Sequence, residues 1–381
     1  MLEIHPGGGV SMSRRLIAAV IALLGSVLVI VGCGGETSPD AVVGQETPAV
    51  AAPGTREALL TFFTGDVLYY DSDEWLLAEI GQTFTDDDRL RVEVGYADLQ
   101  FADKVLIRLQ DGTEVTLRHI ELNPTASDVE VQLDAGAVLT RVERLVTDDS
   151  FTVRTATSVA GVRGTEFLVQ QEGDETIVAV REGTVAVLPA TVDVGAVRRS
   201  AVAQDPQVAE GIREVEAVAI TVTENEEIAV TPEFAAEAEE GFQQLQRVIE
   251  EAEATGAVDQ EALETATTAA RQGIEVGRRR VTPPRPVAPE RQQRLERVDE
   301  MEFVSTTPAT GGGSGGAAPS APELVSITFS TTPEDATILF NGRVVGTGSF
   351  SRLIEEGASF EVSFQREGFE EAAISVDSAE G

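Results

Sequence analysis

The chain has 381 residues, and its 65 acidic side chains against 28 Lys and Arg side chains give a formal net charge of −37 at pH 7. This excess of negative charge argues against nucleic acid and anionic lipid as ligands, because both are bound through clustered cations. A single cysteine excludes a disulfide within the chain, so aliphatic and Phe side chains have to hold the core.

The first residues follow the pattern of a secretory signal. Arg14 and Arg15 precede an apolar stretch from Leu16 to Val31. At about 16 residues this stretch is shorter than a membrane-spanning helix, which needs roughly 20, and it fits the apolar region of a signal peptide. Met12 is a more natural start than Met1, so residues 1–11 are interpreted as translated upstream sequence.

The apolar stretch ends at the only cysteine, in the sequence Ile30-Val31-Gly32-Cys33. This ending resembles the lipobox of bacterial lipoproteins, which are cut just before the cysteine and then acylated on it, with palmitate among the usual chains. The resemblance implies a signal peptide over residues 1–32 and a lipid anchor on Cys33, since two or more acyl chains hold a protein firmly to a membrane. The alternative is a free thiol in an uncleaved membrane anchor.

After the cysteine the composition changes twice. Residues 33–57 are rich in Gly, Pro, Thr, Ala and Glu without periodicity, which predicts a flexible tether. Over residues 58–231, alternating stretches of about four to six residues recur between turns that contain Gly or Asp. This pattern predicts an antiparallel β domain, either a sandwich or a stack of β-coils. A short helix is expected near Val208 to Glu216, and a closing hairpin around Glu224-Asn225.

A series of motifs in this β region carries a family resemblance. In chain order they are Gly65-Asp66-Val67, Trp75, Gly81-Gln82, Leu90, Asp111-Gly112-Thr113, Gly136, Thr155, Gly161-Val162-Arg163-Gly164-Thr165-Glu166-Phe167 and Glu182-Gly183-Thr184-Val185. Their order and spacing resemble the FecR-type domain, over nearly half of the chain, and the run from Val162 to Phe167 is the most specific element. One departure is Ala156, which follows Thr155 where the family usually has Pro.

The motif residues have a structural and a functional interpretation. Gly164 permits a positive φ, and strand alternation places Thr165 and Phe167 on one face and Glu166 on the other. Arg163 is interpreted first as a latch that bonds carbonyls or a carboxylate between two β layers, and second as a ligand-binding arginine. Trp75 is interpreted first as a core or edge anchor, and second as a platform for stacking a sugar.

From Pro232 the pattern becomes helical. Apolar residues recur every three or four positions, Gly256 interrupts them and Asp259 can cap a second helix, so residues 232–280 are expected to form a helical hairpin. Residues 281–322 are first Pro- and Arg-rich and then Gly-rich, which predicts a spacer and a flexible linker.

The segment 271–297 is basic within an acidic chain. It carries eight Arg against three Glu, which leaves a local charge of 8 − 3 = +5. Three interpretations are open: packing against the chain's own acidic surface, a solvated linker, or binding of an anionic envelope polymer or lipid head group.

Residues 323–381 show a second, smaller β pattern. Asn341-Gly342 is typical of a two-residue hairpin turn, since both residues can adopt positive φ. The sequence Pro333-Glu334-Asp335-Ala336 resembles the Pro-Glu-Gly-Ala motif of PEGA domains, with Asp in place of Gly. The resemblance implies a small C-terminal β-sandwich, so the fold class expected for the whole chain is mainly β.

Catalytic patterns are weak. His5 would leave with the signal peptide, and His119 has no second His or Cys with which to share a metal. No serine lies in a nucleophile-elbow motif. Asp86-Asp87-Asp88 lacks the glycine and terminal glutamate of an EF-hand and is interpreted as a solvated acidic turn. We therefore expect no enzyme activity, metal, cofactor or small-molecule substrate.

The leading hypothesis is a non-catalytic envelope lipoprotein whose FecR-like and PEGA-like modules bind or position envelope proteins or peptidoglycan. Gly34 replaces the aspartate that retains lipoproteins at the inner membrane, so the outer membrane, on its periplasmic or surface face, is favoured by analogy with enteric bacteria. FecR-family members are best known as membrane-spanning regulators of a cytoplasmic sigma factor, which need a cytoplasmic domain, and here at most 13 residues precede Arg14. That role and a surface structural or adhesion role remain as alternatives.

Overall fold

A computed structural model of the chain describes residues 56–377, apart from 124–125, 144–148, 163, 305–323, 332–334, 356–357 and 370. The predicted signal peptide with Ile30, Val31, Gly32 and Cys33 lies outside these residues. So do Arg163 of the FecR-like motif and Pro333 and Glu334 of the PEGA-like motif. The described part is mainly β with a few helices, which confirms the fold class predicted from the sequence.

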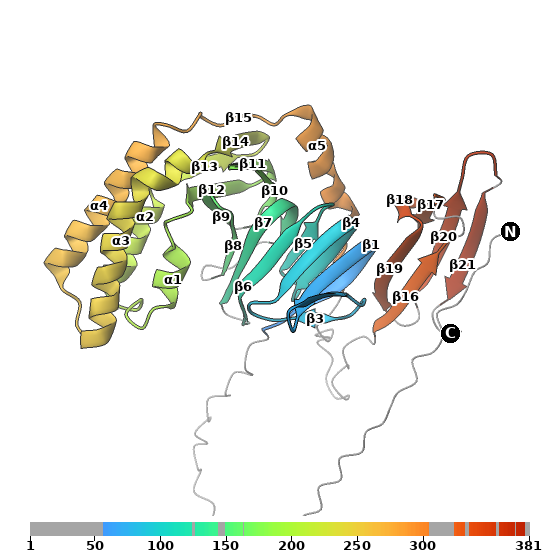
Figure 1. Ribbon diagram of the computed structural model, residues 1–381, viewed down its shortest axis with the longest axis horizontal. Helices are drawn as coiled ribbons and strands as arrows, with labels where there is room; N and C mark the ends of the chain where they lie inside the picture. The colour runs from blue at the N-terminus through green and yellow to red at the C-terminus, as the bar shows by residue number, and fades with distance from the viewer. Residues whose placement is uncertain are drawn as a thin grey trace, which may run out of the picture. The chain divides into compact units, whose positions relative to one another are not determined.

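The elements are labelled in chain order (Figure 1). The strands of the first β domain are β1 (Ala58–Asp71), β2 (Glu74–Leu77), β3 (Thr83–Phe84), β4 (Arg89–Phe101), β5 (Val105–Leu109), β6 (Glu114–Leu122), β7 (Ser127–Val142), β8 (Ser150–Arg154), β9 (Ser158–Val162), β10 (Glu166–Glu172), β11 (Glu175–Glu182), β12 (Thr184–Pro189), β13 (Ile220–Thr223), β14 (Glu226–Val230) and β15 (Arg285–Pro286). The helices are α1 (Val194–Arg199), α2 (Pro206–Glu216), α3 (Pro232–Thr255), α4 (Gln260–Arg278), α5 (Pro289–Glu296) and the 3-10 turn η1 (Arg297–Glu300). The C-terminal strands are β16 (Leu324–Ser330), β17 (Thr337–Phe340), β18 (Arg343–Thr347), β19 (Ser349–Glu355), β20 (Ser359–Gln365) and β21 (Ala372–Asp377).

The first β domain consists of two layers that share strands. The first sheet runs β1–β4–β5–β7–β10–β11–β14–β15 with antiparallel pairing throughout. The second runs β4–β6–β7–β8–β9–β12–β13, in which only β7 and β8 are parallel. Aliphatic and Phe side chains from both layers form one core, as Leu99 and Val169 of the first sheet and Leu117 and Val187 of the second illustrate.

Two long strands pass from one layer to the other at glycines. β4 pairs with β6 before Gly95 and with β5 after it, and β7 pairs with β6 and β8 before Gly136 and with β5 and β10 from there on. The φ angles of Gly95 and Gly136 are +92° and +84°, a region that side chains disfavour. These glycines allow the bends that bring the two layers face to face.

The predicted closing hairpin at Glu224-Asn225 differs in the structure. β13 pairs with β12 in the second sheet, whereas β14 pairs with β11 in the first, so the turn connects the two layers. Local sequence predicts two strands and a tight turn here, but burial on opposite sides of the core decides where each strand pairs.

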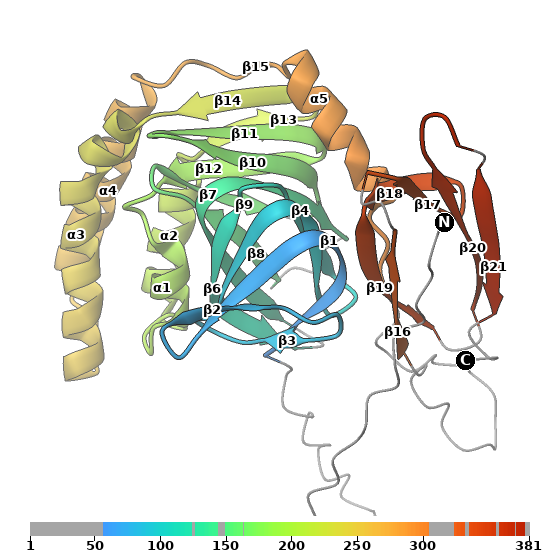
Figure 2. The ribbon, with the colours of Figure 1, turned by 45° about the vertical axis from the view of Figure 1, so that its right-hand side comes forward.

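Helices cover the β12 side of the domain. α3 and α4 lie antiparallel and side by side, and α4 packs on α2 (Figures 1 and 2). Gly256 ends α3 at φ +71° and Asp259 caps α4 through the amide of Ala262, as the sequence predicts. Among the described residues, no helix has both the length and the apolar character to cross a membrane.

The segment 281–304 differs from the spacer and linker predicted for 281–322. β15 pairs with β14, and α5 and η1 cover the outer face of the first sheet, where Leu295, Val298 and Met301 join a buried apolar cluster. Arg291 is buried and donates two hydrogen bonds, of 2.6 and 2.9 Å, to Glu227 on β14. These contacts agree with the interpretation in which the basic stretch packs against the chain's own acidic residues.

The C-terminal strands form a smaller module of two sheets, β16–β19 and β18–β17–β20–β21. Its core contains Phe340, Phe350, Phe360 and Phe364 and also Phe62 from β1. β19 pairs with residues 62–64 of β1, so the β16–β19 sheet continues the first sheet of the larger domain. Asn341 and Gly342 both have positive φ in the turn between β17 and β18, as the sequence predicts, and Ala336 is buried.

Candidate functional site

The FecR-like motif begins β10 and alternates between the two faces of the sheet as predicted. Gly164 has φ +70°, and the buried Thr165 donates its hydroxyl to the carbonyl of Thr184 at 3.2 Å. Phe167 is fully buried, with its ring centroid 6.4 Å from that of Phe151. Glu166 points to the other face, where its carboxylate lies 3.0 Å from Arg181.

Arg181 connects the motif to η1. Its guanidinium donates two hydrogen bonds of 2.8 Å to Asp299, which raise the pKa of Arg181. Burial raises the pKa of Glu166 above its ordinary value, although Arg181 and Arg141 attract its carboxylate. The described part of the motif therefore connects β10 to η1 through Arg181.

Two further features hold this region in place. A Cβ atom on Gly183 would lie 2.8 Å from the carbonyl oxygen of Gly164, so the chain needs glycine there for a close approach. Thr155, which is followed by Ala156 instead of Pro, accepts the amide hydrogen of Ser158 at 3.0 Å and contacts the hydroxyl of Thr176 at 2.7 Å. Buried hydroxyls thus hold the turn from Thr155 to Ser158.

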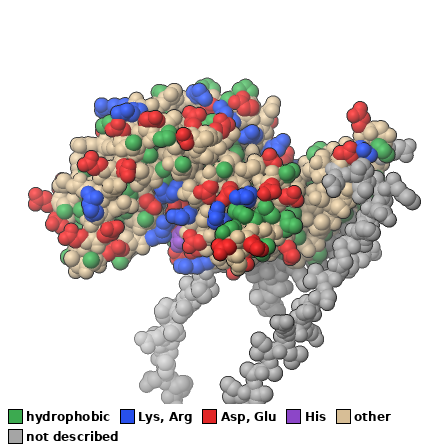
Figure 3. Space-filling view, viewed as in Figure 1, with side chains coloured by type: hydrophobic (Ala, Val, Ile, Leu, Met, Phe, Trp, Pro, Cys, Tyr) green, Lys and Arg blue, Asp and Glu red, His purple; other side chains and the backbone are tan. Residues whose placement is uncertain are grey.

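A surface with exposed aliphatic and half-buried aromatic side chains lies at one edge of the domain. We call it the edge surface and define it by Tyr70, Trp75, Leu77, Arg91 and Val94. Tyr70 faces Trp75 across β1 and β2, with ring centroids 5.2 Å apart, and the Arg91 guanidinium lies 4.1 Å from the Trp75 centroid. Leu77 is 68% exposed and Val94 60% exposed. Figure 3 shows apolar side chains gathered beside cationic ones on the face that carries β1 and β4.

The arginines at this surface form ion pairs with a carboxylate on the neighbouring strand. Arg91 and Arg89 lie 2.7 and 2.5 Å from the carboxylate of Glu114 on β6. Burial alone would raise the pKa of Glu114, but the hydrogen bonds and charges of Arg91 and Arg89 lower it below its ordinary value. Trp75 lies outside the hydrophobic core, on a strand that pairs only with β1 among the described residues.

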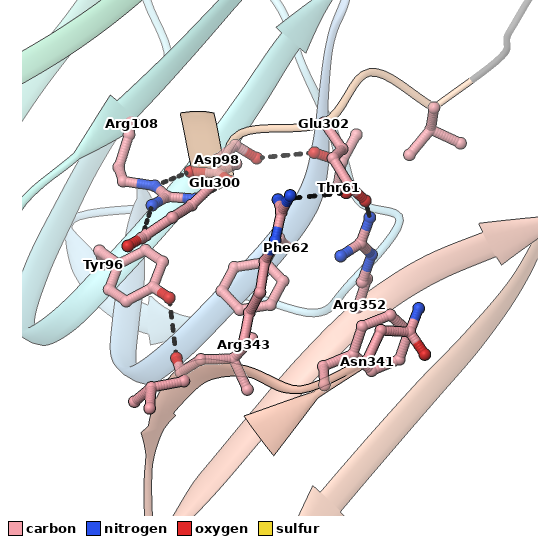
Figure 4. A pocket seen from close by; sticks show the side chains of 14 residues that line it. Thr61, Phe62, Tyr96, Asp98, Arg108, Glu300, Glu302, Asn341, Arg343 and Arg352 are labelled. Atoms are coloured by element: carbon pink, nitrogen blue, oxygen red, sulfur yellow. Dashed lines mark hydrogen bonds and ion pairs between the residues drawn. The ribbon is translucent and has the colours of Figure 1, made fainter. Parts of the chain in front are cut away.

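A second polar site joins the larger domain to the C-terminal module. We call it the charged hollow; its volume is about 220 Å³. The buried Arg108 donates bonds of 2.7 and 2.8 Å to Asp98 and 3.0 Å to Glu300, and Tyr96 donates 2.8 Å to the carbonyl of Val345 (Figure 4). Burial raises the pKa of Tyr96 even though Arg108 lies against its ring. No local pattern in the sequence marks these residues, because Tyr96 and Val345 are 249 positions apart.

His119 and the acidic turn at Asp86 lie next to each other. His119 has carboxylates as charged neighbours, with Asp86, Glu121 and Asp128 each 3.8 Å away. Within the described ranges, no three His, Cys, Asp or Glu residues are arranged to hold a metal ion. Asp86 accepts the backbone amide of Ile120 on β6 at 2.7 Å, and Asp88 accepts that of Thr85 within the turn at 2.6 Å, so both carboxylates bond backbone amides.

Comparison with known proteins assigns part of the chain. Residues 88–186 match the family model described as FecR protein, which confirms the FecR-type domain predicted from the motifs. The match starts after Trp75, and it covers the strands from β4 to β11 and the first half of β12. No curated protein matches the chain.

Two solved structures of a "putative anti-sigma factor" from Parabacteroides distasonis are similar in part. Each is 21% identical over 38% of this chain, with a TM-score of 0.26. The chain spans 55% of the length of these proteins. At this TM-score the likeness carries no argument about the present fold or its function.

Proposed function

We propose that this chain is a non-catalytic FecR-domain protein of the bacterial envelope that binds another protein through the edge surface. The observation that carries the proposal is the exposure of Leu77, two residues from Trp75 on β2, a strand whose outer edge has no partner among the described residues. Val94 on β4 adds a second exposed apolar side chain to the same surface. Exposed apolar patches mark interaction sites, and an open strand edge can accept a strand from a partner.

The contacts of Trp75 favour a protein over a glycan as the partner. Stacking of a sugar needs a free aromatic face, and the Arg91 guanidinium, held by Glu114, already covers one face of the indole at 4.1 Å. A polypeptide strand would instead use the backbone of β2 and the exposed side chain of Leu77. The chain carries a net charge of −37, so a basic partner surface fits best.

Site-specific photo-crosslinking in intact cells tests this proposal. A benzophenone side chain at Leu77 is expected to give a discrete crosslinked protein product, because that position is two-thirds exposed at the open edge. The same group at Val276 on α4, which is 42% exposed, is the matched control and should give none. Absence of a product at both Leu77 and Val94 contradicts the proposal.

The anchor is a separate part of the proposal. It rests on the lipobox-like ending at Cys33, and it would place the folded residues outside the cytoplasm, with the outer membrane favoured. Labelling cells with a fatty-acid analogue should mark the wild-type chain and leave Cys33→Ser unmarked. A labelled Cys33→Ser chain, or an unlabelled wild type, would show that Cys33 is not the anchor.

We also infer that the C-terminal module is PEGA-like. Support comes from its two small sheets, from the Asn341-Gly342 turn and from the buried position of Ala336. In this proposal the module presents its free strand edges from a fixed position, because β19 pairs with β1. An experimental structure of the chain that places residues 335–377 in a different fold would refute the inference.

A second candidate function is regulation of a sigma factor, as is best known for the FecR family. The match of residues 88–186 to that family favours it. Deleting the chain in its native host should then change a defined set of transcripts that depend on one alternative sigma factor. An unchanged transcript profile, together with a crosslinked envelope partner at Leu77, would leave only the first proposal.

A further inference from the structure

A second hollow lies on the outer face of the second sheet, against α1 and the end of α2. We call it the Gly161 groove. Its floor is formed by Thr152, Gly161 and Ala186, and its apolar wall by Val159, Leu188 and Val194. The volume is about 390 Å³, which falls within the range of pockets that bind small molecules.

Gly161 has no backbone reason to be glycine. Its φ is not in the left-handed region, and a Cβ atom there would meet nothing within 4 Å. Glycine in a strand interior lowers stability relative to other residues, and it is common where a ligand approaches the sheet closely. Thr152 and Ala186 face Gly161 from the neighbouring strands, so the floor is low across three strands.

The charges around the groove are already paired. Arg154 lies 2.8 Å from Glu130 and 3.1 Å from Asp193, and Arg198 pairs with Glu216. Burial alone would raise the pKa of Glu130, but the hydrogen bonds and charges of Arg154 and Arg199 lower it. Asp149, at the groove margin, lies 3.0 Å from Lys104.

The floor also lacks an open strand edge. β8, β9 and β12 are each paired on both sides, in the order β7–β8–β9–β12–β13. A ligand in the groove therefore contacts side chains instead of adding a strand, and Val159, Leu188 and Val194 give it an aliphatic wall. The lining carries Arg154 and Arg198 against Glu130, Asp149 and Glu216, a sum of 2 − 3 = −1, within a chain of net charge −37.

We propose that the Gly161 groove binds the aliphatic chain of a small amphiphile with an uncharged polar head, of the acylglycerol class. The aliphatic wall and the open space above Gly161 accommodate the chain. The hydroxyl-bearing Thr152 and Thr184 border the same space and suit an uncharged head. A carboxylate head is disfavoured, because the lining has a net negative charge and its arginines are engaged in ion pairs.

Displacement of a neutral dye tests the proposal. The probe is N-phenyl-1-naphthylamine, which fluoresces in apolar sites, and the competitors are 1-monolauroylglycerol and laurate, both below their micellar concentrations. The protein is the chain from residue 33 with Cys33→Ser, which needs no detergent. We expect the glyceride to displace the dye and laurate to compete at least about tenfold more weakly.

Two variants fill the groove and one serves as control. Gly161→Val and Ala186→Leu add side chains to the floor and should weaken binding of both dye and glyceride by about tenfold or more. Thr221→Val faces the same side one strand further, outside the groove, and should leave binding unchanged. Thermal melting of each variant verifies folding, and Ala186→Leu retains the test if Gly161→Val does not fold.

The outcomes separate the alternatives. Equal binding by wild type and both filled variants overturns the proposal, since the ligand would then lie elsewhere. Competition by laurate as strong as by the glyceride overturns the uncharged-head assignment. A short basic peptide, capped Arg-Ser-Leu-Ser-Arg, is the third competitor. If it displaces the dye and the glyceride does not, the groove docks a protein segment and the proposal is overturned.

Discussion

The charged hollow and the Gly161 groove are both built from segments distant in sequence, yet their linings are opposite. In the charged hollow, Arg108 bonds Asp98 from its own domain and Glu300 from η1, and Tyr96 bonds the C-terminal module. In the Gly161 groove, Arg154 and Arg198 pair with neighbouring acids, and the floor of Thr152, Gly161 and Ala186 stays open. The bonds in the charged hollow hold the larger domain to η1 and to the C-terminal module and so form a joint between segments, whereas the ion pairs of the groove leave an apolar wall uncovered.

The largest expected effect is at the joint. Arg108→Met leaves Asp98 buried without its partner, so we expect the free energy of unfolding to fall by about 3–5 kcal/mol. Chemical denaturation measures it, with Arg213→Met as the control, because the Arg213–Glu210 pair is exposed and worth less than about 1 kcal/mol. The double variant Arg108→Met/Asp98→Leu should recover much of the loss. If the free energy of unfolding falls less than in Arg213→Met, the charged hollow does not hold these segments together.

A second joint responds to pH. Burial alone would raise the pKa of Glu227, but Arg291, the amide of Ala288 and Arg285 lower it from 4.5 to about 2. A depressed folded pKa means that the stabilisation is complete above pH 4.5 and is lost as the pH falls towards 2, an effect of about 3 kcal/mol. Denaturation at pH 6 and pH 3 should show a larger loss for wild type than for Glu227→Gln. Equal losses would place the acid sensitivity elsewhere.

Two glycines near the groove should respond in opposite directions, and Gly183 gives the larger effect. Gly183→Ala is strained, because φ is +89° and the new Cβ atom would lie 2.8 Å from the carbonyl oxygen of Gly164. We expect a loss of about 1–3 kcal/mol in unfolding free energy. The matched variant Thr184→Ala, at the next and exposed position, should change stability less. A neutral Gly183→Ala would show that the close approach is not required.

The smallest expected effect is a gain at Gly161. Gly161→Val replaces a flexible residue by a β-branched one in open space, so stability should rise by about 0.5–1 kcal/mol. Thermal melting measures the change in stability. Thr221→Val is the control, because it exchanges one β-branched residue for another and leaves backbone flexibility unchanged. A stabilised variant that no longer binds the dye would make Gly161 a residue selected for ligand space at the expense of stability. A destabilised one would mean that the groove floor is already packed.

The sequence predicted local features better than the joints. Asp259 as a helix cap, the Asn341-Gly342 turn and the alternation of Thr165, Glu166 and Phe167 depend on neighbours within a few residues, and the structure shows each. Of the spacer and linker predicted over 281–322, residues 281–304 are instead packed. Prolines and charges indicate exposure in the sequence, but here an acidic partner buries Arg291. Glu227 is about 60 positions from Arg291, and nothing local marks either as buried.

The pattern of residues by itself determined a mainly β chain with a FecR-type domain, because strand alternation, turn glycines and the motif around Gly164 are read within short windows. Only the tertiary structure decided which ion pairs connect separate segments and where open volume remains between the packed elements. Burial and pairing depend on segments that meet across the fold, such as β1 with β19 and β14 with α5. Gly161 shows the difference most clearly: its identity is plain in the sequence, but the open volume above it exists only after three strands and a helix have packed around it.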